Sequence, residues 1–362
     1  MDYFEIDLKY IRSETLDCNF ENSNILITGC AGFLGYYLIN YFEKYKKELK
    51  INSIVGLDSF LLGYPNWLKK IASQENSILD LVEFDIGKDK LENSKKFNGI
   101  THIIHMASIA SPTFYRKFPI ETVDANIWGL RNLLDFYCKS QNLRGFLFFS
   151  SSEIYGDPDQ KNIPTNEDYR GLVSCTGPRA CYDEAKRFGE TLCCIYRETY
   201  DLPLTIVRPF NNYGPGMRID DKRLPADMAN CIIKNKPIIL FSNGQPTRTF
   251  CYVADAICGY IKALNSGLKK EFNIGIDSEE TSVLDFAKLF RNIGRDLINY
   301  NCDIEFANNI DKKYLVDNPN RRCPDIRKAR IELNYDPKIT IIDGINRYLS
   351  HLIREHEYCD NR

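Results

Sequence analysis

The chain has 362 residues, a hydrophobic content of 44% and a formal net charge of −2 at pH 7. This length suggests two domains, or one large domain with a lobe, and the near-neutral charge excludes the broad basic surface of proteins that bind nucleic acid or anionic membranes. No run of about 18 apolar residues predicts a membrane span, and the N-terminus lacks the apolar core of a signal peptide. The 13 cysteines lack zinc-type spacings, so we expect reduced thiols, a cytoplasmic protein and no metal site.

A glycine-rich turn follows the first predicted strand of the core. Residues 24–28 (NILIT) indicate a buried strand, and the pattern G-x-x-G-x-x-G then leads into an amphipathic helix that continues over residues 36–48. Strand, turn and helix form a dinucleotide-binding fingerprint, because the glycines let the backbone approach a pyrophosphate and the helix N-terminus attracts it. The predicted cofactor contacts in this turn are Gly29, Gly32, Phe33, Leu34 and Gly35.

Polar residues also follow the next predicted strands. Residues 51–57 form a strand that ends in Asp58. An acid at this point holds both ribose hydroxyls of adenosine and repels a 2′-phosphate, so it favours NAD over NADP. Strands over residues 81–84 and 100–106 end beside further predicted cofactor contacts, which are Asp85 and Ile86 near the adenine and Ala107 and Ser108 near the pyrophosphate.

Strands and helices alternate along the first two thirds of the chain. This alternation predicts an α/β fold with a doubly wound parallel sheet of the Rossmann type and a smaller, partly discontinuous C-terminal substrate lobe. The predicted parts are an N-terminal extension (1–22), the NAD-binding domain (23–208, with 247–265 returning to it), the substrate lobe (209–246 and 266–350) and a C-terminal tail (351–362).

A serine-rich strand end and a Tyr-x-x-x-Lys pair carry the predicted chemistry. Tyr182 and Lys186 are four residues apart, so they share one face of a helix that runs to about residue 200. To accept a proton from an alcohol near neutral pH, a tyrosine needs a pKa well below its usual value of about 10. We expect Lys186 and the positive charge of a nicotinamide to lower the pKa of Tyr182, with Ser151 sharing the proton path.

With these motifs in order, the chain resembles the extended short-chain dehydrogenase/reductase superfamily of nucleotide-sugar enzymes. Within it, the chain is most similar to the UDP-glucuronate decarboxylases, also called UDP-xylose synthases. The resemblance covers about residues 24–348 and is carried by HMASIASP (105–112), SSSEIYGDP (150–158), GPRACYDEAKR (177–187), RPFNNYGPGM (208–217), PTRTFCYVAD (246–255) and DNPNRRCPDI (317–326).

The resemblance implies an NAD-dependent carboxy-lyase that converts UDP-glucuronate to UDP-xylose and CO₂ through a 4-keto intermediate and recycles its NADH. In this interpretation Glu153 acts around C5 of the sugar, and Arg248 meets the substrate carboxylate. The implied catalytic residues are Ser151, Glu153, Tyr182, Lys186 and Arg248, and the implied substrate contacts are Tyr115, Asn211, Arg223, Arg248 and Arg322, with Arg321 as the alternative to Arg322. Family members usually pair through two long helices, which predicts a homodimer formed by residues 122–140 and 181–200.

Several departures leave alternatives open. Ser151 stands where the decarboxylases usually have threonine, and neither residues 60–75 nor the leader before residue 24 match the family pattern. A 4,6-dehydratase commonly has an aspartate where this chain has Ser152, and a 4-epimerase needs neither Glu153 nor an arginine for a departing carboxylate. Simple oxidation at C4 is a further alternative. A non-catalytic NAD-binding scaffold is disfavoured because Ser151, Tyr182 and Lys186 are all present.

Overall fold

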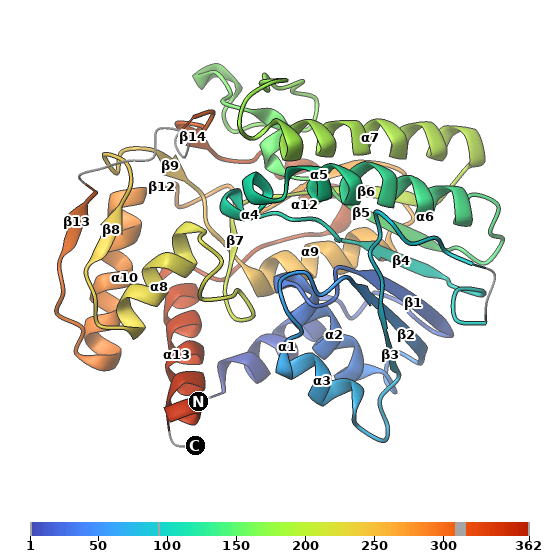
Figure 1. Ribbon diagram of the computed structural model, residues 1–362, viewed down its shortest axis with the longest axis horizontal. Coiled ribbons are helices and arrows are strands. Elements are labelled where there is room, and N and C mark those ends of the chain that lie inside the picture. Colours follow the sequence, from blue (N-terminus) through green and yellow to red (C-terminus); the bar gives the residue numbers. More distant parts are fainter. Residues whose placement is uncertain (1, 93–94, 308–315, 361–362) are drawn as a thin grey trace.

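A seven-stranded sheet forms the centre of the molecule (Figure 1). The computed structural model describes residues 2–92, 95–307 and 316–360, with side chains to residue 356. The strand order is β11-β6-β5-β4-β1-β2-β3 and every neighbouring pair is parallel, which confirms the predicted doubly wound fold. The strands are β1 (Ser23–Thr28), β2 (Ile51–Asp58), β3 (Leu79–Glu83), β4 (His102–His105), β5 (Gly145–Phe149), β6 (Leu204–Pro209) and β11 (Glu271–Ile274).

Both faces of the sheet are buried, and the strand sequences explain why. Ile25 and Ile27 of β1 belong to one apolar cluster, whereas Leu26 between them belongs to the other. Successive side chains of a strand point to opposite faces, so a continuous apolar run suits a strand that is covered on both sides. One face is covered by α2 (Phe33–Tyr45) and α9 (Val253–Asn265), and the other by α6 (Leu130–Tyr137) and α7 (Ala180–Tyr200).

The helix predicted over residues 122–140 consists of three consecutive helical pieces. These are α5 (Pro119–Val123), a π-helical turn η1 (Asp124–Gly129) and α6. Gly129 at the end of the turn packs directly on Ile86, because a Cβ placed there would lie 2.8 Å from the Cγ2 atom of Ile86. A π-turn is a local widening that often marks a functional region, and this one lies beside the predicted adenine contact.

A smaller lobe follows the sixth strand. Its main elements are α8 (Leu224–Ile233), α10 (Val283–Ile298), α13 (Ile341–Asp360), and the pair formed by β8 (Ile238–Leu240) and β13 (Ile304–Phe306). A three-stranded sheet in the order β12 (Thr281–Ser282), β9 (Thr247–Arg248), β14 (Arg321–Arg322) reaches toward the first lobe. The remaining short elements are α3 (Asn66–Ala72), α4 (Pro112–Lys117), η2 (Ser152–Tyr155), η3 (Gln160–Asn162), β7 (Asn212–Tyr213), β10 (Cys251–Tyr252) and α12 (Arg327–Leu333). Among the described residues, no helix is both long and apolar enough to cross a membrane.

Two segments from the second half of the chain return to the first lobe. Helix α9 packs against β5 and β6 of the first lobe, whereas β9, at the start of the range 247–265, belongs to the small three-stranded sheet. Strand β11 pairs with β6, so it extends the central sheet although its residues fall within the range 266–350 predicted for the second lobe. The buried Asn273 of β11 donates to the carbonyl oxygens of Thr165 and Asp325, which ties this edge strand to both lobes.

The N-terminal extension is part of the core. Its helix α1 (Tyr3–Glu14) packs against α2, α9 and α13. The buried carboxylate of Asp7 accepts hydrogen bonds from the hydroxyls of Tyr37 and Tyr252, at 2.8 Å and 2.6 Å, and from the guanidinium of Arg347 at 2.7 Å. These partners come from α2, β10 and α13, so one carboxylate joins the extension to both lobes.

We expect Asp7→Ala to destabilise the protein by about 3–5 kcal/mol, because it leaves the Arg347 charge and two tyrosine hydroxyls without their buried acceptor. Urea unfolding measures this loss. Lys9→Ala on the exposed side of the same helix is the matched control and should change the free energy of unfolding by less than about 0.5 kcal/mol. Equal stability of the two variants would contradict the role of Asp7.

Candidate active site

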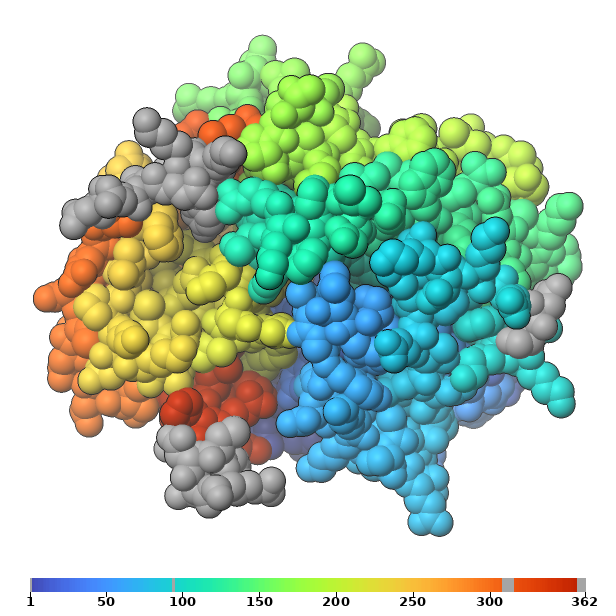
Figure 2. All heavy atoms as spheres, viewed as in Figure 1, coloured from blue at the N-terminus to red at the C-terminus, as the bar shows by residue number. Residues whose placement is uncertain are grey.

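A cleft of about 1290 Å³ lies between the two lobes. The first lobe lines it with the glycine turn and the carboxyl ends of β1, β2, β4 and β5, and the second lobe lines it with residues between 209 and 250 and between 318 and 322. In Figure 2 the yellow surface of the second lobe meets the blue and teal surface of the first lobe. Ligands of open α/β sheets bind where the strand order reverses, which here is between β1 and β4.

The glycine turn leaves the N-terminal end of α2 accessible from the cleft. Gly29 has φ +71°, and a Cβ at this residue would lie 2.8 Å from the backbone of Ala107 at the end of β4. Gly32 is the residue that precedes α2, and a side chain at Gly35 would overlap the carbonyl of Cys30. The turn therefore packs tightly on its own lobe, where the backbone N–H groups of residues 29–32 are already hydrogen-bonded, and the first N–H groups of α2 are left to face the cleft, as a diphosphate requires. Phe33 and Leu34 form the first residues of α2 and line the cleft.

The two predicted acids lie at the ends of neighbouring strands. The Asp58 carboxylate accepts hydrogen bonds from the backbone N–H groups of Ala31, at 3.0 Å, and Phe60, at 2.9 Å, so it is fixed against the glycine turn. Burial raises the pKa of Asp58, although these two hydrogen bonds partly offset the effect. Asp85 lies farther out, where it accepts from the backbone of Gly87 and pairs with Lys88.

Two serine hydroxyls along the floor of the cleft have buried oxygens without a hydrogen-bond partner among the described residues. They belong to Ser108, which follows β4, and Ser150, which follows β5. A buried hydroxyl without a partner costs about 1–3 kcal/mol, so such groups are expected where a ligand completes the hydrogen bonds. The backbone N–H of Ala107, which lies just before Ser108, is held by the Thr28 hydroxyl at 3.2 Å.

Ser151, Tyr182 and Lys186 meet at one end of this floor. Ser151 caps the short helix η2, with its hydroxyl accepting from the backbone N–H of Glu153 at 3.2 Å. Lys186 donates to the carbonyl oxygen of Phe149 at 2.7 Å, and its ammonium lies 5.8 Å from the centre of the Tyr182 ring. The Tyr-x-x-x-Lys pair is therefore on one face of α7, as predicted, and that face points into the cleft.

Burial dominates the electrostatics of the pair in the protein without its cofactor. Burial raises the pKa of Tyr182 to about 12, with a hydrogen bond to Ser151 acting in the opposite direction. Burial also lowers the pKa of Lys186 to about 7, because an ammonium is poorly solvated in this environment. The expected lowering of the Tyr182 pKa by Lys186 together with a bound nicotinamide stays a prediction.

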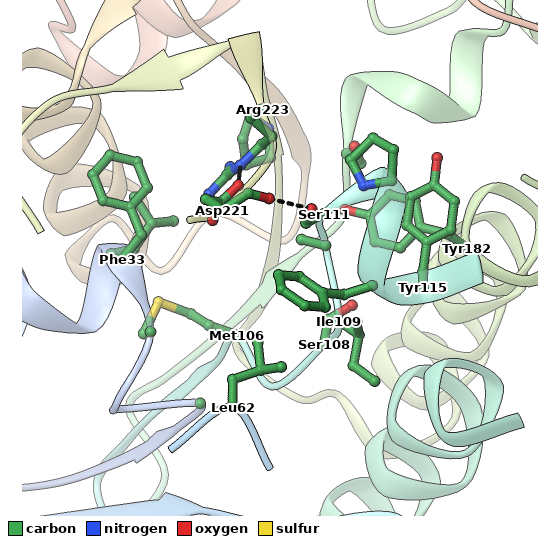
Figure 3. Close-up of a pocket in the computed structure, with 18 of the residues that line it drawn as sticks. Phe33, Leu62, Met106, Ser108, Ile109, Ser111, Tyr115, Tyr182, Asp221 and Arg223 are labelled. Carbon is green, nitrogen blue, oxygen red and sulfur yellow. Dashed lines mark hydrogen bonds and ion pairs between the residues drawn. The ribbon is translucent and has the colours of Figure 1, made fainter. Parts of the chain in front are cut away.

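Tyr115 supports Tyr182 from the side. The two rings are stacked, with centres 5.2 Å apart and an interplanar angle of 11°, and they stand next to each other in Figure 3. Tyr115 belongs to α4 and is buried. The sequence predicts Tyr115 as a substrate contact, and the structure gives it a second task, which is to hold the Tyr182 ring in place.

Glu153 lies between two guanidinium groups. Arg179 donates to one of its carboxylate oxygens and Arg322 to the other. Burial alone would raise the pKa of Glu153, but the charges of Arg179 and Arg322 outweigh burial and hold that pKa well below its usual range. Arg322 was predicted to bind a diphosphate, whereas the structure places it with Glu153 and the carbonyl oxygen of Gly156. Its neighbour Arg321 points elsewhere and pairs with Glu280.

A third guanidinium, that of Arg248, completes this cluster. Strands β9 and β14 are paired with Arg248 opposite Arg322, which brings the two arginines side by side although 74 positions separate them in the chain. Arg248 is half-buried and donates to the carbonyl oxygens of Pro319 and Thr247, at 2.6 Å and 2.7 Å. Burial and the nearby charge of Arg322 lower the pKa of Arg248 to about 10.

Arg223 lies at the other end of the cleft, nearer the glycine turn. It pairs with Asp221 at 2.5 Å and lies over the Phe33 ring at 5.6 Å, and Figure 3 shows these three side chains together. A hydrogen bond from Ser111 to the Asp221 backbone oxygen, 2.6 Å long, fixes this loop to the first lobe. Asn211 also lines the cleft and donates to the Thr249 carbonyl oxygen at 3.0 Å.

The sequence analysis did not single out Arg179 and Asp183. They flank Tyr182 in the segment GPRACYDEAK and lie four residues apart, a spacing that allows an ion pair on a helix. This four-residue spacing is the feature of the sequence that could have indicated the ion pair between Arg179 and Asp183. The contact with Glu153 could not be read from it, because Glu153 lies 26 positions away in a different element.

A model of the NAD dependent epimerase/dehydratase family matches residues 25–275. The chain belongs to this family. UDP-glucuronic acid decarboxylase 1 of Danio rerio is 32% identical over 341 residues, which cover 94% of this chain and 75% of that protein. UDP-glucuronic acid decarboxylase 3 of Arabidopsis thaliana is 33% identical over 324 residues, which cover 90% of this chain and 87% of that protein.

Solved structures of epimerases and dehydratases share the fold of this family member. UDP-glucuronic acid 4-epimerase from Bacillus cereus, solved with UDP-glucuronic acid and NAD, has a TM-score of 0.75 and 27% identity, with 92% of this chain and 99% of that chain covered. dTDP-glucose 4,6-dehydratase from Bacillus anthracis, solved with NAD, has a TM-score of 0.74 and 20% identity, with 93% of this chain and 98% of that chain covered. The chain is an NAD-dependent enzyme of the extended short-chain dehydrogenase/reductase type, which confirms the resemblance and the predicted cofactor.

The residues of the cleft fit this cofactor. The glycine turn lets the backbone pack closely at the start of α2, Asp58 lies at the end of β2, where the adenosine ribose of a dinucleotide binds, and the Ser108 and Ser150 hydroxyls have no hydrogen-bond partner among the described residues. When bound, NAD⁺ supplies a positively charged ring and the acceptor for a hydride. Lys186 and Tyr182 line the same cleft.

The lowered pKa of Lys186 predicts a pH dependence of stability. Between pH 7 and about 10 the unfolded chain keeps a proton on Lys186 that the folded chain has released, so the free energy of unfolding rises with pH across this window. Below pH 7 both states are protonated and the contribution is constant. Lys186→Met should remove this part of the rise, measured by urea unfolding at several pH values. Lys139→Met at an exposed position is the control, and an identical pH profile for wild type and Lys186→Met would contradict the prediction.

Proposed function

We propose that this enzyme decarboxylates a nucleotide-linked hexuronate, converting UDP-glucuronate to UDP-xylose and CO₂. The environment of Arg248 is the observation on which the proposal rests. Its guanidinium lies in the cleft beside Glu153 and Arg322, and none of the ion pairs among the described residues includes it. A partly desolvated cation that hydrogen-bonds to carbonyl oxygens is suited to a ligand carboxylate, and such a charge-assisted contact contributes about 1.5–3 kcal/mol.

Charge balance supports a uronate over a neutral sugar. Three guanidinium groups, of Arg179, Arg248 and Arg322, lie around the Glu153 carboxylate, with Asp183 behind Arg179 and Asp157 acting on Arg248. A C6 carboxylate beside Arg248 would give this guanidinium an ion-pair partner. The named activity of the decarboxylase relatives, and the UDP-glucuronic acid bound in one solved neighbour, point to the same class of substrate.

The chemistry assigns a separate task to each side chain. In the proposed reaction Tyr182 takes the proton of the C4 hydroxyl, with Ser151 in the hydrogen-bonded path, and bound NAD⁺ would supply the acceptor for the C4 hydride. A C4 ketone would make the substrate a β-keto acid, so the C5–C6 bond could break with its electrons passing into the carbonyl and CO₂ leaving. C5 would then take up a proton from water, and Tyr182 would return its proton to the C4 oxygen as the ketone is reduced again. No net oxidation occurs.

The state of Glu153 favours decarboxylation over dehydration. A 4,6-dehydratase needs an acid to protonate the departing C6 hydroxyl, and a carboxylate held by two guanidinium groups is a poor proton donor. Ser152, which precedes it, is a weaker acid still. Glu153 is suited instead to accept hydrogen bonds near C5.

Arg223 and Asn211 are proposed to hold the nucleotide diphosphate, since they line the cleft where the second lobe faces the glycine turn. Arg322 is proposed to act on the sugar side through Glu153, in place of the diphosphate contact predicted from the sequence.

A second candidate is C4 epimerisation of the same uronate. The solved neighbour at 27% identity that carries this name is the observation that favours it. Epimerisation conserves the carboxylate and releases no CO₂, so the products separate the two reactions.

We expect the purified protein with NAD⁺ to release CO₂ from UDP-glucuronate and to form a nucleotide pentose, detected by mass spectrometry and NMR. Arg248→Ala should lower kcat/KM for UDP-glucuronate by roughly 10- to 100-fold, because it removes a charge-assisted contact. Tyr182→Phe should abolish turnover and retain NAD binding.

Arg321→Ala is the matched control, because Arg321 neighbours Arg322 but pairs with Glu280. This variant should keep wild-type turnover. Formation of a nucleotide hexuronate epimer without CO₂, or dehydration of a neutral nucleotide hexose with UDP-glucuronate left intact, would refute the decarboxylase proposal.

We also propose a homodimer formed through α7 and the neighbouring π-turn η1. Trp128 of η1 is 61% exposed, and Phe188 and Ile195 of α7 are 48% and 51% exposed. The two elements are in contact, so these large apolar side chains extend over one surface of the molecule. Such side chains normally lie in an interface, and a second copy of the chain would cover them.

Trp128→Glu combined with Phe188→Glu should convert a dimer to a monomer, measured by light scattering during size-exclusion chromatography. Ile331→Glu on α12, where the side chain is 82% exposed, is the apolar-to-acidic control and should leave the mass unchanged. A monomeric wild type would contradict the proposal.

A further inference from the structure

Arg179 lies at the junction of three elements in the cleft. It is the residue immediately before α7, and it is buried. Its guanidinium donates to Glu153 of η2, to Asp183 of α7 at 3.2 Å and to the Asn318 side chain at 2.7 Å. The donors of a guanidinium lie in one rigid plane, so three partners in different directions fix its orientation.

Asp183 holds Arg179 from the helix side. It is buried, and burial together with the negative charge of Glu153 raises the pKa of Asp183. One of its oxygens accepts from Arg179, and the other has no hydrogen-bond partner among the described residues. Asp183 directly follows Tyr182 in the chain. Arg179 is therefore anchored on the same helix that carries Tyr182 and Lys186.

The two arginines that hold Glu153 come from different lobes. Arg322 belongs to β14 in the small sheet of the second lobe, whereas Arg179 belongs to the first lobe with Glu153 itself. Each takes a different carboxylate oxygen. The first lobe therefore fixes one oxygen of the Glu153 carboxylate through Arg179, and the second lobe fixes the other through Arg322.

Arg179 also keeps Glu153 from pairing with Arg248. The positive charges of Arg179 and Arg248 both act on the Glu153 carboxylate. Without Arg179, the oxygen it occupies would be free to turn toward Arg248, and Glu153 would then compete with a substrate carboxylate for the same cation.

We propose that Arg179 is a positioning residue, which aims the Glu153 carboxylate at the sugar and keeps Arg248 available for the substrate carboxylate. The proposal rests on the proposed decarboxylation and deepens it. Arg179 would act after C4 oxidation, because that first step uses Ser151, Tyr182 and Lys186.

The test compares two signals in single turnover, the NADH absorbance that reports C4 oxidation and the release of CO₂. Arg179→Gln should form NADH at close to the wild-type rate and release CO₂ roughly 10- to 100-fold more slowly, so that NADH accumulates, since one charge-assisted contact is lost. Arg179→Lys should recover part of the CO₂ release, because it restores the charge without the planar fork. Arg197→Gln, on the same helix but paired with Glu271, is the control and should match wild type in both signals.

A double-mutant cycle shows whether Arg179 acts through Glu153. Glu153→Gln combined with Arg179→Gln should be no slower than Glu153→Gln alone. If the two substitutions slowed CO₂ release independently, so that their factors multiplied in the double variant, the proposal would be overturned. An equal slowing of NADH formation and CO₂ release in both Arg179 variants would also overturn it. If Arg179→Gln does not fold, the double-mutant cycle with Glu153→Gln is measured with Arg179→Lys instead.

The product of the wild-type enzyme tests the decarboxylation separately. If wild type releases no CO₂ from UDP-glucuronate, the proposed function fails. The cycle, measured on whichever product forms, still shows whether Arg179 and Glu153 act as one unit.

Discussion

The ion pairs of Glu153 join the two lobes inside the cleft, beside the residues proposed to react. One guanidinium comes from the helix that carries Tyr182 and Lys186, and the other from the small sheet of the second lobe. Two opposite charges 4 Å apart attract by about 4 kcal/mol at an effective dielectric constant of 20, and breaking a buried pair costs about 3–5 kcal/mol. A displacement of either lobe would strain these contacts, so the width of the sugar end of the cleft depends on them.

The second lobe is held to the first at a distance from the cleft as well. The Asp7 carboxylate accepts hydrogen bonds from side chains of α2, β10 and α13. The Asn273 side chain donates hydrogen bonds from the edge of the central sheet to two loops. In both cases a buried polar side chain has its hydrogen bonds satisfied by segments that are far apart in the chain. Such groups are costly to bury unless every partner is in place, so they favour a single arrangement of the lobes.

Burial also disfavours the charged forms of Tyr182 and Lys186 in the protein without its cofactor. It raises the pKa of Tyr182 and lowers that of Lys186, so both groups favour their neutral forms. A positive charge bound beside Tyr182 would favour the phenolate, which is the form that accepts a proton. A tyrosine that becomes basic only beside its oxidised cofactor would link proton removal to hydride transfer.

Local patterns in the sequence were sufficient to predict the first four strands of the central sheet, the glycine turn, the acid after β2 and the Tyr-x-x-x-Lys helix, because each depends on residues close together in the chain. The π-turn within residues 122–140 and the return of β11 to the central sheet were not predicted, since tertiary packing sets both. The pairing of Glu153 with Arg179 and Arg322 depends on residues 26 and 169 positions away. The pKa values of Tyr182 and Lys186 depend on burial, which exists only in the folded chain. The spacing of Tyr182 and Lys186 by itself places both side chains on one face of a helix, whereas their protonation depends on the desolvation that folding imposes.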